Sequence, residues 1–244
     1  MGNRMKVIFI ILFYLILIGN VGAWNSNGHR TVVEIAYYSA DISLQQKLNL
    51  TLLKEGATAP DLVFHDVVKH HYPPSYNLAE KWLKEARYYY YLNDYNQASY
   101  SFGVASHYIS DSFVAPHYIS KEPGSLHSKF ERIQDYNIDV KCYKQEINLN
   151  SSLNEASGNK KDWLNWTLTY NPEIPRKEFA QAVNLTIPIF LNTFDSDCNN
   201  LKTEVINKGF RLNNNTIIFL SLILISYLTF FVNKKYKLTK KIKF

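Results

Sequence analysis

The sequence is poor in glycine, and stretches of alternating apolar and polar residues, which mark half-buried β-strands, are hard to find. Nine of its 244 residues are glycine, and no internal repeat or low-complexity linker divides the chain. These absences argue against a sheet-based fold and against several domains joined by flexible segments. Because helical spacing of apolar residues is easier to find, we expect one all-α domain whose inward-facing side chains build a site between helices.

Cysteine is scarce as well, with only Cys142 and Cys198 in the whole chain. Both lie outside the segment that holds the histidines, so we favour a disulfide that ties the C-terminal part to the core over a role in metal binding. An exported protein permits such a bond, although the spacing of the two residues does not decide it.

The N-terminal segment has the pattern of a signal peptide at residues 1–23. Arg4 and Lys6 precede twelve apolar residues (7–18), and small residues at 21–23 provide a cleavage site. The alternative is an uncleaved anchor. Cleavage after Ala23 would leave Trp24 with a free α-amine.

The C-terminal segment predicts a transmembrane helix at residues 216–232, seventeen positions without a charge. Six lysines follow at 233–244, which predicts a cytoplasmic basic tail and a preceding domain outside the cell. With the leader and tail set aside, 19 basic residues face 21 acidic ones. The basic overall charge therefore belongs to the membrane flanks and does not predict a nucleic-acid-binding surface.

Several segments have the periodicity or the capping residues of helices. We expect helices at Thr31–Ala40, at Leu78–Leu92 after an Asn77 cap, at about 95–114 after an Asp94 cap, at Leu126–Val140, and at about Glu178–Asn207. The polar segment from Glu146 to Pro175 reads as a long surface excursion. Five N-x-Ser/Thr sequons permit glycosylation of an exported surface, at Asn49, Asn150, Asn165, Asn184 and Asn214.

All seven histidines fall between residues 29 and 127 and sit beside acids at meaningful spacings. His107 and Asp111 are four residues apart on an expected helix and share one face, as do His127 and Glu131. His117 lies between the two pairs. A single pair of this kind is usually a surface ion pair. Two pairs with His117 in 25 residues favour a zinc site, because zinc takes imidazole nitrogens and carboxylate oxygens.

Further candidate ligands lie upstream of these pairs. Asp61 follows a turn, and His70 and His71 stand nine and ten residues later. Trp24 and His29 lie at the proposed mature N-terminus, where an α-amine and its own carbonyl can chelate a metal. We expect His65 and Asp66 to be supporting or surface groups.

This order of residues resembles the superfamily of zinc-dependent phospholipases C and S1/P1 nucleases over Trp24 to Glu131. The resemblance rests on a Trp at the mature N-terminus, Gly-His soon after, an isolated Asp, His-x3-Asp-x5-His and a final His-x3-Glu. It implies a compact all-α catalytic domain, here residues 24–211, with three zinc ions in a cleft. Glu131 in the last position resembles the phospholipase branch.

The resemblance implies three zinc sites that share ligands. The first would be held by Asp61, His70, His107 and Asp111, the second by His117, His127 and Glu131, and the third by Trp24, His29 and Asp111. Asp111 would therefore bridge two ions. His70 is preferred to His71 because the aromatic stretch that follows it resembles the family's, although Asp61 to His70 is shorter than the family spacing.

The implied activity is hydrolysis of a phosphodiester by a metal-activated hydroxide, with Asp61 orienting or deprotonating the nucleophile. A phospholipid substrate fits the expected membrane anchor, but Asn27 and Leu62 depart from the family's choline-binding pattern, which leaves the head group open. The alternatives are a single-strand nuclease, with Tyr72, Tyr108 or Tyr118 stacking on a base, and a non-catalytic zinc-stabilised surface domain.

Overall fold

The computed structural model describes residues 26–66, 68–132 and 138–199, which belong to one compact unit. Every element in these ranges is a helix apart from an isolated β-bridge between Ala40 and Cys198, so the expected all-α fold is confirmed there. Within the same ranges no helix has the length and apolar character needed to cross a membrane. The expected leader at 1–23, Trp24, the span at 216–232 and the basic tail lie outside the described residues.

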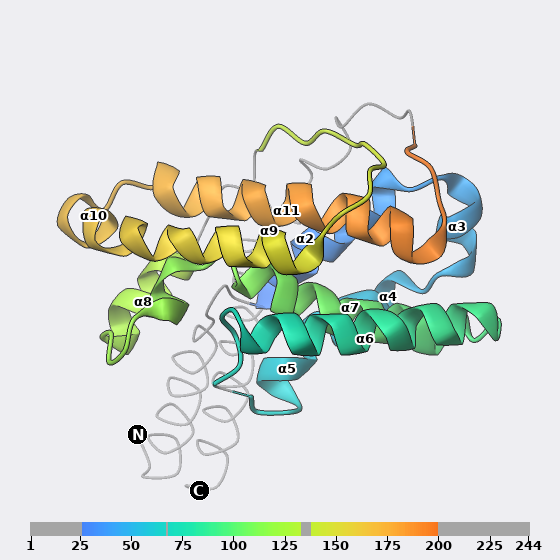
Figure 1. Cartoon of the computed structure of the whole chain (residues 1–244), viewed down its shortest axis with the longest axis horizontal. Coiled ribbons are helices and arrows are strands. Elements are labelled where there is room, and N and C mark those ends of the chain that lie inside the picture. The colour runs from blue at the N-terminus through green and yellow to red at the C-terminus, as the bar shows by residue number, and fades with distance from the viewer. Residues whose placement is uncertain (1–25, 67, 133–137, 200–244) are drawn as a thin grey trace, which may run out of the picture. The chain divides into compact units, whose positions relative to one another are not determined.

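Most of the described helices follow one another with short connections, with longer ones between α5 and α6 and between α8 and α9, and Figure 1 shows their arrangement. In chain order they are α2 (Ser26–Ser39), α3 (Ile42–Lys47), α4 (Leu50–Gly56), α5 (Ala59–Leu62), α6 (Pro74–Tyr91), α7 (Tyr95–Asp111), the 3-10 turn η1 (Ala115–Tyr118), α8 (Gly124–Glu131), α9 (Leu149–Ala156), the 3-10 turn η2 (Ser157–Lys161), α10 (Asp162–Thr169) and α11 (Glu173–Phe194).

Helix α7 is the centre of the core. Nearly all of its residues from Ala98 to Asp111 are buried, and α2, α4, α6 and α11 pack against it. Phe102 on α7 meets Phe190 on α11 edge to face, with ring centroids 4.7 Å apart. A helix enclosed in this way holds the side chains on every face in fixed positions, which suits a site that needs several converging ligands.

Two glycines allow α4 to approach α7 at backbone distance. A Cβ atom on Gly56 would lie 2.2 Å from the Tyr100 carbonyl oxygen, and one on Gly103 would lie 2.2 Å from that of Leu53. Real Cβ atoms do not approach so closely, so only glycine permits this contact. The close approach fixes the end of α4 against the middle of α7.

The sequence predicted some helix boundaries correctly and others wrongly. Asp94 caps α7 as expected, because its side chain accepts the Gln97 N–H. Asn77 is not a cap, since α6 already begins at Pro74, where a proline in the first turn loses no helical hydrogen bond. Helix α8 ends at Glu131 instead of Val140, and α11 begins at Glu173 and ends at Phe194, before an αL residue at Asp195.

The expected surface excursion at 146–175 is wrong, because this segment forms α9, η2 and α10. The segment is mostly polar, but it contains a few apolar residues that are buried: Leu153, Ala156, Trp163 and Trp166. The ring of Trp166 meets that of Phe130 on α8 edge to face at 5.0 Å. These helices therefore support the segment that carries the second histidine–carboxylate pair.

The predicted disulfide between Cys142 and Cys198 is confirmed, with the two Cα atoms 5.9 Å apart. Cys198 also forms the β-bridge with Ala40 at the end of α2. The bond thus joins the segment after α8 to the segment after α11, beside the first described helix.

Candidate metal centre

His107 and Asp111 lie one turn apart on the same face of α7 and are 0 % and 1 % exposed. His107 Nδ1 donates to the Ala57 carbonyl oxygen at 2.9 Å, just past the end of α4. This bond turns the other ring nitrogen, Nε2, towards Asp111, whose Oδ2 lies 3.0 Å away. The close contact between α4 and α7 therefore orients the imidazole of His107.

The Asp111 carboxylate lies among four imidazoles. Its Oδ2 is 3.0 Å from His107 Nε2 and 2.5 Å from His70 Nδ1, while its Oδ1 is 3.3 Å from His29 Nε2 and 3.9 Å from His117 Nδ1. These histidines come from α7, α2, η1 and the segment before α6. One buried carboxylate thus connects residues that are up to 88 positions apart in the chain.

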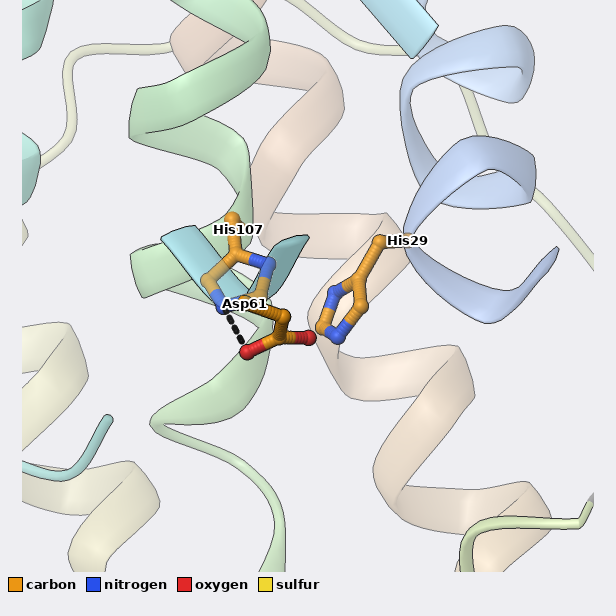
Figure 2. A group of neighbouring side chains, drawn as sticks. All are labelled: His29, Asp61 and His107. Atoms are coloured by element: carbon orange, nitrogen blue, oxygen red, sulfur yellow. Dashed lines mark ion pairs between the residues drawn. The ribbon is translucent and has the colours of Figure 1, made fainter. Parts of the chain in front are cut away.

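Asp61 on α5 and His29 on α2 approach His107 from outside α7, as Figure 2 shows. Asp61 Oδ1 lies 3.5 Å from His107 Nε2 and 3.7 Å from His70 Nε2. The second oxygen of Asp61 points towards the His29 ring (Figure 2). Among these residues Asp61 is the most exposed, so it faces the solvent side of the cluster.

A second cluster brings His117, His127 and Glu131 together around η1 and α8. Glu131 Oε1 lies 3.1 Å from His117 Nε2 and 2.8 Å from His127 Nε2. His127 Nδ1 lies 2.5 Å from Glu122 Oε1 on the loop before α8. Since His117 also faces Asp111, this residue adjoins both clusters.

Every residue of the three zinc sites implied by the resemblance falls in one of these clusters, apart from Trp24, which lies outside the described residues. His70 reaches the cluster, whereas the ring of His71 packs edge-on against Tyr118 at 5.5 Å. His65 is exposed, and Asp66 supports the loop, since its carbonyl oxygen accepts His70 Nε2–H. These contacts agree with the supporting or surface roles expected for His65 and Asp66.

Sequence reasoning missed Glu122. It stands five residues before His127, and the helix begins only at Gly124, so no helical spacing connects the two. Ser110, which bonds His29, and the Ala57 carbonyl were missed too. A loop carboxylate, a buried hydroxyl and a backbone oxygen have no distinctive spacing by which they could be found.

Four histidines share one arrangement, in which one ring nitrogen donates to an acceptor and the other faces a carboxylate. The acceptors are Ser110 Oγ for His29, the Asp66 carbonyl for His70, the Ala57 carbonyl for His107 and Glu122 for His127. The Ser110 hydroxyl donates its own proton to the His107 carbonyl, so at Ser110 the imidazole of His29 is the donor. Metal-binding histidines in proteins are held in the same way.

The buried Asp111 carboxylate favours positive charge in the first cluster: burial opposes protonation of His70, but the hydrogen bond to Asp111 raises the pKa of His70 to about 10. Burial opposes ionisation of Asp111, but attraction by His107, His29 and His117 outweighs it and holds the pKa of Asp111 well below its usual value. Burial lowers the pKa of His29 to about 3, and His107 adds to this effect, so His29 is neutral near pH 7. The lone pair of a neutral imidazole is available to bind a metal ion.

In the second cluster burial also opposes ionisation of Glu131, yet hydrogen bonds from His117 and His127 lower its pKa to about 2. Burial works against protonation of His127, but its bonds to Glu131 and Glu122 raise the pKa to about 9. Two buried atoms that face each other across the clusters, Asp111 Oδ1 and His117 Nδ1, make no hydrogen bond. The residues present therefore fit metal ions, which would satisfy both atoms.

Ligand atoms gather into three groups, within each of which all atoms lie within 4.8 Å of one another. The groups are His29 with Asp61 and His107, His70 with Asp111 and His117, and His117 with His127 and Glu131. The third group has the same members as the second site implied by the resemblance. The first two groups contain the other candidate ligands that the structure describes, but combine them differently from the sites that the resemblance implies.

A cavity of about 460 Å³ opens beside the first cluster. Its wall combines aromatic and aliphatic side chains with two lysines, and it is lined by Phe64, Asp66, Lys69, Leu78, Lys81, Trp82 and Tyr108. Tyr108 follows His107 on α7, and its hydroxyl donates to Asp66 Oδ2 at 3.1 Å. The cavity adjoins the candidate metal centre through Asp66, whose carbonyl oxygen accepts His70 Nε2–H.

Comparison with known proteins agrees with this chemistry. A sequence model of the zinc dependent phospholipase C family matches residues 29–181, which is more than half of the chain and includes every described candidate ligand. No curated protein matches the chain significantly. The family's activity makes the chain a hydrolase of phosphoric diesters, and its zinc dependence accords with the histidine–carboxylate clusters. The chain belongs to the zinc-dependent phospholipase C family.

Proposed function

We propose that the chain hydrolyses the phosphodiester bond of a phospholipid head group with three zinc ions bound in the candidate metal centre. The observation that carries the proposal is the shared arrangement of the four histidines, each held by an outer acceptor with its inner nitrogen aimed at a carboxylate. Ion pairs alone do not require the outer acceptors, whereas metal ligation uses them to fix the ring orientation.

The ligand sets are those that the order of residues implies. Asp61, His70, His107 and Asp111 would hold one ion, and His117, His127 and Glu131 a second. Trp24 with His29 and Asp111 would hold the third. The 3.3 Å separation of His29 Nε2 from Asp111 Oδ1 supports the last set, because both atoms face one point from two sides. Mixed imidazole and carboxylate ligands are those that zinc prefers in catalytic sites.

Bound zinc would supply Lewis acidity and a water of lowered pKa near neutral pH. The chain's own contribution is to place the proton acceptor and the phosphodiester. Partial burial raises the pKa of Asp61, and this effect with those of Asp111 and Glu131 outweighs attraction by His107 and His70, which brings the carboxylate closer to the basicity that a general base needs. Its exposed position lets Asp61 orient the attacking water and accept its proton.

The contacts of the tyrosines and the charge of the exported part favour a phospholipid over a nucleic acid. Two of the three tyrosines considered for base stacking already have structural roles. Tyr108 is buried and bonds Asp66, and the Tyr118 hydroxyl donates to the Ser112 carbonyl oxygen. The exported part carries more acidic than basic residues, which gives no attraction to a polyanion.

The expected leader and C-terminal span lead us to propose that the enzyme acts outside the cell while anchored to its membrane. Both segments lie outside the described residues, and the proposal rests on their sequence patterns. Such an anchor would keep the metal centre close to lipid head groups.

The test is to purify the full chain in detergent, measure zinc per chain, and assay a chromogenic phosphodiester, phospholipid micelles and single-stranded DNA. We expect about three zinc ions and preferential release of a phosphorylated head group. Zinc without hydrolysis of any of the three would indicate a structural metal domain, and faster cleavage of DNA would indicate a nuclease.

A further inference from the structure

The segment between Asp61 and His70 exposes apolar side chains at the edge of the metal centre. Leu62, Val63, Phe64 and Val68 are 56, 63, 41 and 67 % exposed, and we call these four residues the apolar rim. Single exposed apolar residues are ordinary on a protein surface, but four within seven positions beside a candidate active site are not. In the view of Figure 1, α5 lies on the side of α6 away from α11.

Hydrogen bonds hold the apolar rim in a fixed conformation. The N–H groups of Val63 and Phe64 donate to the Ala59 carbonyl oxygen at 2.8 and 2.9 Å. Asp66 Oδ1 accepts the N–H groups of Val68 and Lys69, both at 3.1 Å. These bonds constrain the described residues on both sides of position 67, which lowers the entropic cost of burying their side chains against another surface.

The ring of Phe64 stacks on that of Trp82, with centroids 5.8 Å apart and planes at 9°. Trp82 lies on α6, so this contact ties the apolar rim to a long helix of the core. Phe64 nevertheless stays partly exposed, with its neighbours Val63 and Leu62 projecting further. The contact with Trp82 therefore holds the apolar rim against α6, while its apolar side chains remain exposed to solvent.

Two lysines flank the apolar rim. Lys69 makes no ion pair with any residue that the structure describes, and Lys81 pairs only with Glu85, one turn along α6, at 3.9 Å. Such an exposed pair within a helix is weak. The nearby Asp66 carboxylate is engaged by backbone N–H groups and by the Tyr108 hydroxyl, so it does not neutralise the lysines by pairing with them. Apolar side chains bordered by cations that are unpaired or only weakly paired are complementary to an anionic lipid surface.

We propose that the apolar rim, with Lys69 and Lys81, docks onto the surface of an anionic phospholipid bilayer. The four apolar side chains enter the boundary between head groups and acyl chains, and the lysines contact lipid phosphates. Asp61 and His70 border the rim in sequence, so docking presents the metal centre to the head-group layer. The hydrolysis that follows docking rests on the proposed function, but the docking itself does not.

The direct test places a fluorophore on the rim of the full-length protein. Cys142 and Cys198 are bonded to each other, so Val63→Cys introduces the only free thiol for an environment-sensitive label. Tyr91→Cys is the matched control, because Tyr91 is 79 % exposed at the C-terminal end of α6, about 14 Å along the helix from Trp82, on which Phe64 stacks. Both proteins are reconstituted into vesicles that contain doxyl-labelled lipid as a quencher.

We expect the label at position 63 to be quenched in vesicles of phosphatidylcholine with phosphatidylglycerol, and less in phosphatidylcholine alone. Each of Lys69→Gln and Lys81→Gln should lower the ratio of docked to undocked protein about fivefold, and added salt should do the same. The proposal fails if the label at position 91 is quenched equally. It also fails if the label at position 63 responds to protein concentration without lipid, which would indicate self-association.

A second test separates docking from catalysis. The double variant Val63→Asp, Val68→Asp changes two exposed side chains that are not candidate ligands, and should slow hydrolysis of long-chain phospholipid in vesicles about tenfold or more. Its activity on a short-chain phospholipid below the micelle concentration should be unchanged. Equal loss on both substrates would overturn the docking proposal. If the unaltered protein hydrolyses neither lipid, the proposed function fails, while the quenching experiment still decides whether the rim docks.

Discussion

The two histidine–carboxylate clusters differ in how the chain builds them. The cluster around Asp111 collects side chains from α2, α5, α7 and the segment before α6, and His107 and Asp111 are fully enclosed. The cluster around Glu131 uses residues 117–131 alone, and its histidines keep 11 and 21 % of their side-chain surface exposed. One site therefore depends on the whole fold, whereas the other depends on one turn and one short helix.

This difference predicts how many ligands a substitution in each cluster should affect. Asp111 faces four imidazoles, so its loss should affect all four. Because Asp111 is buried, water cannot easily take its place. Glu131 faces two imidazoles whose side chains are 11 and 21 % exposed, so its loss should affect those two histidines, which water can reach. The first cluster should accordingly respond to change as one unit, and the second should respond independently.

The largest effect is expected from Asp111→Asn, which removes a charge shared by two proposed ions. Zinc content should fall from about three ions per chain to about one, and phosphodiester hydrolysis should drop well beyond the roughly 100-fold that loss of a supporting residue costs. Metal analysis and turnover measure this, and circular dichroism checks that the helices persist. A variant with full metal content and activity would contradict the bridging role.

Glu131→Gln is the matched change in the local cluster. We expect the loss of one ion, because His117 and His127 alone make a poor site, and retention of the two ions around Asp111. Hydrolysis should fall strongly as well, since the ions are proposed to act together. Loss of all zinc from this variant would show that the two clusters are not independent.

The third prediction concerns the proposed mature N-terminus at Trp24. A protein that begins Met–Trp24 has its α-amine one residue away from the proposed ligand position, so it should bind about one zinc ion fewer than a protein that begins at Trp24. Hydrolysis should be reduced, although less than in Asp111→Asn, because His29 and Asp111 remain. Equal metal content in the two proteins, determined by native mass spectrometry, would exclude the α-amine as a ligand.

The smallest effect is expected from Glu122→Gln, which changes a group that touches His127 but is not a proposed ligand. The amide still accepts the His127 Nδ1–H, but it no longer supports the imidazole with a charge, so the affinity for one ion should fall about 10- to 100-fold. Titration with a competing chelator measures this affinity. A change in the affinity of every ion would mean that Glu122 acts on more than the local cluster.

The sequence predicted the local parts of the site and could not predict the non-local ones. The spacing of four in His107–Asp111 and His127–Glu131 places each pair on one helical face whatever the fold. By contrast, the contact of His29 with Ser110 and that of His107 with Ala57 depend on how α2 and α4 pack against α7. No periodicity within one segment contains that information.

The same reasoning explains the errors in the fold. The apolar residues of α9 and α10 are too few to stand out in a polar segment, yet Trp163 and Trp166 supply large buried surfaces. Helix α8 stops at Glu131, earlier than its pattern suggested, because a pattern reports which face is apolar and marks helix ends poorly. Asp94 was predictable because a cap is a local hydrogen bond.

The geometry of the metal centre also depends on Gly56 and Gly103 between α4 and α7, although neither residue is a candidate ligand. A side chain at Gly103 would push α4 away and carry the Ala57 carbonyl from His107 Nδ1. A genetic screen for inactive but exported variants should therefore recover substitutions at Gly56 and Gly103 alongside those of the histidines. During evolution, Gly56 and Gly103 should therefore be replaced as rarely as a metal ligand.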